Sequence, residues 1–107
     1  MSQPLVVVDA ENVRRSAWPN VSKEELVERV RRWARDEDVR LLIVFDGAAP
    51  QDADDLLGSG ARSADDVIAE LDGPFWLVSS DRGLRDRVTG RAERLIGGGS
   101  FLRELGV

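Results

Sequence analysis

The residues Leu5-Val6-Val7-Val8-Asp9-Ala10-Glu11-Asn12 join an apolar run to an abrupt polar end. Four apolar residues in succession, three of them valines, predict a strand over Leu5–Val8 that is buried on both faces. Such a strand usually lies at the centre of a parallel sheet, with helices on either side. In open α/β sheets, ligands bind beyond the carboxyl ends of the strands. We therefore expect the polar cluster after this run to lie at a binding site.

The length and composition limit the possible chemistry. A chain of 107 residues suits one domain, which we expect to span residues 1–107. The chain has no cysteine and no histidine, which excludes disulfides, thiolate chemistry, histidine acid–base catalysis and most zinc sites. We find no membrane-length apolar stretch and no signal pattern, so we expect a soluble cytoplasmic protein without a membrane partner. A homodimer remains open.

Further along the chain, apolar runs alternate with helical patterns. Ser22 and Glu25 form a capping box for a helix that ends near Arg35 or Asp36. Ser63 is expected to cap a second helix, another follows Asp81, and Ser100 is expected to cap a terminal helix after a turn at Gly97–Gly99. Trp18, in a loop or short helix over Asn12–Val21, is either exposed or packed on the next helix. The remaining strands are predicted at Val39–Phe45, Phe75–Val78 and Glu93–Ile96, with at most a short edge strand at Leu56–Leu57.

This alternation predicts a three-layer α/β/α fold of the Rossmann-like kind, with a parallel sheet of four to five strands. If the second and third long strands lie on opposite sides of the first, a cleft opens beside the first strand. Asp9, Asp46 and Asp81 each end one of these strands and would border that cleft. The fold therefore predicts that acids far apart in the sequence meet.

Six acids are candidates for this one cleft: Asp9, Glu11, Asp46, Asp65, Asp66 and Asp81. Carboxylates held together without a cation repel one another and raise one another's pKa. Bound Mg²⁺ or Mn²⁺ removes this conflict, because hard cations prefer oxygen ligands, and it can activate water for attack on a phosphoryl group. The formal charge of −5 argues against a nucleic-acid partner, but the chain without these six acids carries +1.

Each acid also has a structural explanation. Asp81 could cap the helix that follows it, Asp65 and Asp66 could serve a helix dipole, and Asp46 before Gly47 could belong to an ordinary turn. Other polar residues near the same strand ends are candidates for phosphate contacts. Asn12 could donate to a phosphate oxygen or a metal-bound water without adding negative charge, or it could be a turn residue. Ser80 could hold a phosphate or a ligand water, or only extend the Asp81 cap. Arg82 and Arg85 could bind phosphates or belong to the solvated surface.

Four motifs, taken in order, resemble the NYN domain, a branch of the PIN-like ribonucleases. They are Asp9-Ala10-Glu11-Asn12, Ala64-Asp65-Asp66-Val67-Ile68, Val78-Ser79-Ser80-Asp81-Arg82-Gly83-Leu84-Arg85 and Gly98-Gly99-Ser100-Phe101-Leu102. The resemblance covers essentially the whole chain. It implies a PIN-like fold and a ribonuclease that depends on Mg²⁺ or Mn²⁺. The motif positions are Asp9, Asn12, Asp65, Asp66 and Asp81, with Asp46 as a further metal ligand.

Two alternatives remain. A phosphoacceptor receiver domain has a similar sheet and an acidic pocket, but it needs a lysine near the last strand, and the only lysine is Lys23 on an early helix. The other alternative is a catalytically inactive PIN-like module that binds RNA or a protein. Metal-dependent turnover distinguishes this module from a ribonuclease.

Overall fold

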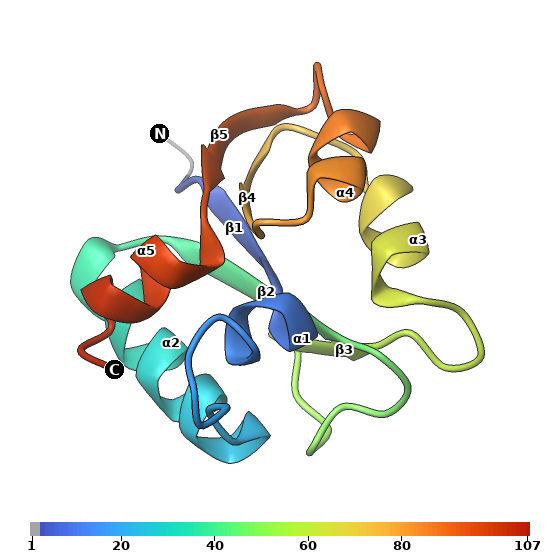
Figure 1. The fold of residues 1–107 in the computed structure, drawn as a ribbon. Coiled ribbons are helices and arrows are strands. Elements are labelled where there is room, and N and C mark those ends of the chain that lie inside the picture. Colours follow the sequence, from blue (N-terminus) through green and yellow to red (C-terminus); the bar gives the residue numbers. More distant parts are fainter. Residues whose placement is uncertain (1–2) are drawn as a thin grey trace.

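Five parallel strands form one sheet in the order β3-β2-β1-β4-β5, and helices cover both of its faces (Figure 1). The computed structural model describes residues 3–107. In chain order the elements are β1 (Leu5–Asp9), α1 (Ala10–Arg14), α2 (Lys23–Glu37), β2 (Arg40–Phe45), β3 (Leu56–Gly58), α3 (Ala64–Ala69), β4 (Phe75–Val78), α4 (Arg82–Arg87), β5 (Ala92–Ile96) and α5 (Gly98–Glu104). No helix within residues 3–107 is both long and apolar enough to cross a membrane.

Strand β1 lies at the centre of the sheet, between β2 and β4. Val8 of β1 is aligned with Ile43 on one side and with Val78 on the other. Every neighbouring pair of strands is parallel. The three-layer parallel fold predicted from the sequence is therefore confirmed, and the direction in which the chain winds reverses beside β1.

The valines of β1 explain why this strand is central. Successive side chains of a strand point to opposite faces. Val6 and Val8 pack with α1, α2 and α5 on one face, whereas Val7 packs with α3 and α4 on the other. All three valines are fully buried. Burial of each aliphatic side chain stabilises the fold by about 1.5–3 kcal/mol. Because its valines alternate between the two faces, β1 stabilises the core on both sides of the sheet.

The predicted serine caps of two helices are confirmed. Ser22 Oγ accepts a hydrogen bond from Glu25 N at 3.0 Å, and Ser63 Oγ accepts one from Asp66 N at 3.1 Å. The second half of the predicted capping box is absent among the bonds of the described residues. The Glu25 carboxylate instead accepts from Arg29 Nε at 2.8 Å, because the i+4 arginine lies on the same side of the helix.

The predicted start of the terminal helix is wrong. Helix α5 begins at Gly98 with Gly97 at its N-cap, so Ser100 lies inside the helix and the glycines do not form a separate turn. A Cβ on Gly98 would stand 2.4 Å from Ser16 Oγ and 3.1 Å from Asn12 Oδ1. Glycine is needed here for close approach of α5 to α1.

This approach predicts opposite effects for two neighbouring substitutions. Gly98→Ala should lower the free energy of unfolding by about 1–3 kcal/mol, because an inserted methyl group overpacks the contact with Ser16. Gly99→Ala should be neutral or stabilising, since its Cβ would meet only Arg103 Nη1 at 3.7 Å and alanine favours a helix. Urea unfolding measures both. Equal stabilities of the two variants would contradict the overpacking explanation.

Candidate functional site

A pocket lies at the carboxyl ends of β1, β2 and β4, where the winding of the chain reverses. It is lined by Asp9, Glu11, Asn12, Arg15, Asp46, Ser63, Asp65 and Asp81. Asp9 ends β1, and Asp46 and Asp81 follow β2 and β4. The other lining residues come from α1, from α3 and from the residues that cap these helices. The fold thus brings together four aspartates that are separated by up to 72 residues of sequence.

Asp9 is the buried carboxylate of this pocket. Only 4% of the residue is exposed, and Ser79 Oγ donates a hydrogen bond to Asp9 Oδ2 at 2.9 Å. Burial raises the pKa of Asp9 from its ordinary value of 3.8 to about 6. The Ser79 hydrogen bond opposes this rise, and the charges of Asp65, Asp46 and Asp81 add to it. The pKa of Asp9 is therefore raised both by its burial and by repulsion from the other aspartates of the pocket.

Asp65 responds to the same environment. Burial raises its pKa, the negative charges of Asp81 and Asp46 raise it further, and Arg87 opposes the rise. Both neighbours also cap helices: Ala64 N donates to Asp46 Oδ1 at 2.7 Å, and Leu84 N donates to Asp81 Oδ1 at 2.9 Å. The capping explanation for Asp81 is therefore confirmed. Within residues 3–107 the second carboxylate oxygen of each capping aspartate has no hydrogen bond.

A second group of polar contacts fixes Asn12. Its Oδ1 accepts a hydrogen bond from Ser80 N at 2.8 Å, and Ser80 Oγ accepts one from Gly98 N at 2.8 Å. We call these three residues the Asn12–Ser80–Gly98 bracket, because they join α1, the end of β4 and the start of α5. Since the amide oxygen is committed, the Asn12 amide nitrogen stays available as a donor at the pocket.

Four predicted residues do not line the pocket. Asp66 pairs with Arg87 at 2.9 Å, and the hydrogen bond from Arg87 lowers the Asp66 pKa. Ser80 belongs to the bracket, Arg82 is exposed at the first turn of α4, and Arg85 is half-buried further along that helix. Asp66 therefore lies apart from the four clustered aspartates.

The prediction from sequence overlooked two residues of the pocket, Arg15 and Ser63. Arg14 Nη1 pairs with Glu11 Oε2 at 2.6 Å, whereas Arg15 Nη2 is 3.9 Å from the same atom. Glu11 is thus neutralised mainly by Arg14, and the Arg15 side chain, 69% exposed, is a loosely held cation. The i, i+4 spacing of Glu11 and Arg15 could have placed Arg15 beside Glu11. This spacing brings two side chains together only in a helix, and the sequence predicts a loop or a short helix over residues 12–21.

The donor chemistry of the pocket fits a hard divalent cation. Its acidic side chains offer oxygen ligands. The pKa values of Asp9 and Asp65 are raised first by burial and then by the neighbouring aspartates, and a cation would relieve this second contribution. The arrangement is not a finished coordination sphere, because no three acids in the described part of the chain are close enough to hold one ion. Side-chain movement would be needed to complete a metal site.

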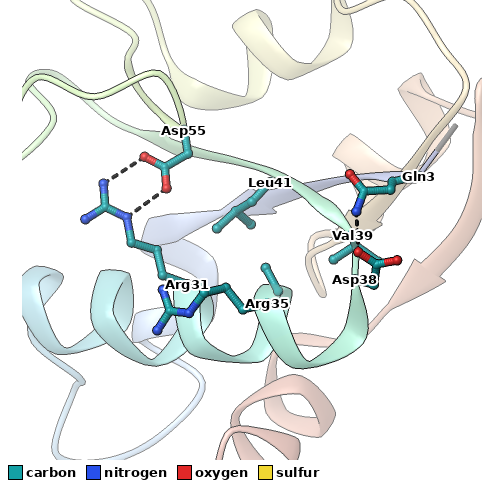
Figure 2. Close-up of a pocket in the computed structure, with 8 residues that line it drawn as sticks. Gln3, Arg31, Arg35, Asp38, Val39, Leu41 and Asp55 are labelled. Atoms are coloured by element: carbon teal, nitrogen blue, oxygen red, sulfur yellow. Dashed lines mark hydrogen bonds and ion pairs between the residues drawn. The ribbon is translucent and has the colours of Figure 1, made fainter.

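A larger hollow, of about 640 Å³, lies near the amino ends of β1 and β2 (Figure 2). Arg31 grips Asp55 there through two hydrogen bonds, of 2.7 and 2.8 Å, which lower the Asp55 pKa. Gln3 donates to Asp38 on the other side of the hollow. Arg31 and Asp55 satisfy each other's hydrogen bonds, as do Gln3 and Asp38, and both pairs hold loops against α2. Because these polar groups are already paired, the smaller acidic pocket is the stronger candidate for a functional site.

Fold and site together define a three-layer α/β protein with an acidic pocket at its topological switch point. No family model matches the chain, and no curated protein matches it. Its fold is similar to that of Rae1 (YacP) from Bacillus subtilis. The W164L mutant of Rae1 aligns with a TM-score of 0.76 and 16% identity over 97% of this chain and 76% of that chain. A second Rae1 structure aligns with a TM-score of 0.70 and 17% identity over 97% and 74%. This likeness shows that the chain shares its three-layer α/β fold with Rae1.

The raised pKa of Asp9 predicts how stability depends on pH in metal-free buffer. The folded state holds the Asp9 proton more tightly than the unfolded state, whose pKa is near the ordinary 3.8. This stabilisation is fully present below pH 3.8 and is lost as the pH rises through about 6. The difference between the two pKa values corresponds to about 3 kcal/mol of folding free energy when the carboxyl group is fully protonated in both states.

Asp9→Asn tests this linkage, because asparagine cannot ionise but can still accept from Ser79. Between pH 4 and pH 7.5 the stability of Asp9→Asn relative to wild type should rise by about 2.4 kcal/mol in urea unfolding, because at pH 4 part of the unfolded state is already ionised. Asp66→Asn is the matched control of opposite sign: the Asp66 pKa is lowered, so its charge stabilises the fold near neutral pH. A pH-independent difference between Asp9→Asn and wild type would rule out the buried charge.

Proposed function

We propose that this chain is a metal-dependent ribonuclease that hydrolyses RNA phosphodiester bonds at the acidic pocket. The observation that carries the proposal is the meeting of four aspartates at the strand ends, with the pKa of Asp9 raised by burial and by the other three. The motif resemblance to NYN domains supplies the substrate class. A cluster of like charges that destabilises the metal-free fold is understandable if a cation normally neutralises it.

Asp9, Asp65 and the second oxygens of Asp46 and Asp81 would hold Mg²⁺ or Mn²⁺. The ion would supply an activated water and neutralise charge on the phosphoryl group. Asp66 is left out of this set, because it is paired with Arg87 outside the pocket.

The remaining pocket residues would handle the phosphate. The Asn12 amide nitrogen would donate to a phosphate oxygen, since the bracket occupies the amide oxygen. Arg15 would contact a neighbouring phosphate from the rim, because Arg14 already neutralises Glu11. With no histidine in the chain, histidine-assisted attack by the 2′-hydroxyl is unavailable. We therefore expect water to attack phosphorus. The P–O3′ bond would break and the 3′ oxygen would take up a proton, so that the products carry a 5′-phosphate and a 3′-hydroxyl.

A catalytically inactive PIN-like module that binds RNA or a protein is the second candidate. It is favoured by one observation: no three acids among residues 3–107 are close enough to hold an ion. The capping bonds of Asp46 and Asp81 would then be the main role of those residues.

The reaction is tested with an end-labelled single-stranded RNA and Mg²⁺ or Mn²⁺. Asp9→Asn should lower the rate by more than about 100-fold, since even outer-shell partners of a metal account for roughly 10–100-fold. Asp86→Asn, an exposed acid of α4, should behave like wild type. Asp66→Asn distinguishes a metal ligand from a structural ion pair. If Asp66 is a metal ligand, as the motif implies, the variant should lose activity. If Asp66 only pairs with Arg87, the variant should retain activity. Cleavage that persists in excess EDTA, or products with a 2′,3′-cyclic phosphate, would exclude this mechanism.

Metal binding is tested without RNA. Mn²⁺ should raise the melting temperature of the wild type, because a ligand that binds only the folded state stabilises it. The rise should shrink in Asp9→Asn and Asp65→Asn and persist in Asp86→Asn. If calorimetry detects no Mn²⁺ binding at millimolar concentration, the metal assignment is wrong.

A further inference from the structure

Trp18 is the most exposed large hydrophobic residue among those the structure describes. It is 90% exposed, whereas Leu57, Leu95 and Val107 are 36%, 42% and 43% exposed. Tryptophan carries a large apolar ring that proteins usually bury or use for recognition. Neither the fold nor the pocket described above uses this side chain, so its exposure needs a separate explanation.

The loop that carries Trp18 is braced at its base. Val21 N donates to Arg14 O at 3.3 Å, and Arg14 Nε donates back to Val21 O at 2.8 Å. Ser16 Oγ donates to Asn12 O at 2.8 Å, while Val21 is buried in the core. Trp18 therefore lies in a short loop whose two ends are joined to each other and to the protein interior.

This loop begins at the acidic pocket. Arg15, which lines the pocket, is three residues before Trp18, so their Cα atoms are at most about 11 Å apart. Figure 1 shows the loop between α1 and α2, at the end of the sheet where β1 gives way to α1. Cations and exposed aromatic rings along one path are the usual means of binding single-stranded nucleic acid, with sites of about 4–16 nucleotides.

The negative charge of the chain disfavours RNA binding through phosphate contacts, so contacts with the bases would matter more. With a net charge of −5 and four aspartates at the pocket, counterion release contributes less to RNA binding than in a basic protein. Base stacking on an aromatic ring needs no net positive charge. Arg15 can complement it, since its guanidinium is only loosely paired with Glu11.

We propose that Trp18 is a stacking platform for a base of single-stranded RNA bound at the acidic pocket, with Arg15 on the adjoining phosphate. The proposal rests on the proposed function, because that function supplies RNA as the ligand. The ring would hold one nucleotide beside the pocket and position its neighbour at the aspartates. Trp18 is thus a positioning residue rather than a catalytic one.

The test uses the full chain carrying Asp9→Asn as parent, so that RNA stays intact, and a labelled oligoadenylate in Mg²⁺. Trp18→Ala should weaken binding by about 5- to 150-fold in fluorescence anisotropy. Trp18→Phe should retain most of the affinity, because phenylalanine still stacks. Leu95→Ala is the matched control, an exposed apolar residue on β5, and should bind like the parent.

Intrinsic fluorescence gives a second readout. Oligoadenylate should quench the parent's emission, and Trp18→Phe should remove most of that quenching, because the remaining tryptophans, Trp33 and Trp76, are partly buried. In the otherwise wild-type chain, Trp18→Ala should raise KM for single-stranded RNA and leave kcat nearly unchanged. The same strand annealed to its complement should bind without dependence on Trp18, because its bases are paired inside the duplex and are not free to stack on the ring.

The outcomes separate this inference from the proposed function. Unchanged affinity of Trp18→Ala, as expected if the ring contacts a protein instead, overturns the stacking role even if the wild type cleaves RNA. An equal loss in Leu95→Ala, or no RNA binding by the parent, also overturns it. Binding that depends on Trp18 in a chain without metal-dependent cleavage supports stacking and rejects the ribonuclease.

Discussion

The burial of one carboxylate at the end of the central strand is the constraint on which the site depends. Asp9 follows three fully buried valines, so the sheet that stabilises the fold also draws this carboxylate out of water. Ser79 supplies one hydrogen bond, which only partly offsets the loss of hydration. Three further aspartates then raise the electrostatic cost. The fold therefore keeps a locally unfavourable charge cluster, as functional sites commonly do.

The Asn12–Ser80–Gly98 bracket shows how the fold holds the surroundings of that charge. One amide oxygen and one hydroxyl join three elements that are distant in sequence. The contact leaves no space for a side chain on Gly98, so a glycine forms the first residue of α5 despite its low helix propensity. Close packing here orients Asn12, and the cost to the helix is local.

The sequence predicted the architecture well, because runs such as Val6–Val8 and Phe75–Val78 carry a strong strand signal and the serine caps are local. It failed at α5, where the cap comes from Ser80, eighteen residues away in sequence. The clustering of Asp9, Asp46, Asp65 and Asp81 followed from topology. The separation of Asp66 did not, because its Arg87 partner lies on another helix.

The adjacent aspartates of α3 illustrate why a motif alone does not define a site. Consecutive helical residues point about 100° apart, so Asp65 and Asp66 point in different directions from the same turn. Burial and the neighbouring acids raise the pKa of Asp65, whereas the hydrogen bond from Arg87 lowers the pKa of Asp66. Capping and ligand binding, in contrast, are compatible in Asp46 and Asp81. Each uses one oxygen to satisfy a helix N–H, which fixes the carboxylate and leaves its other oxygen without a hydrogen bond among residues 3–107.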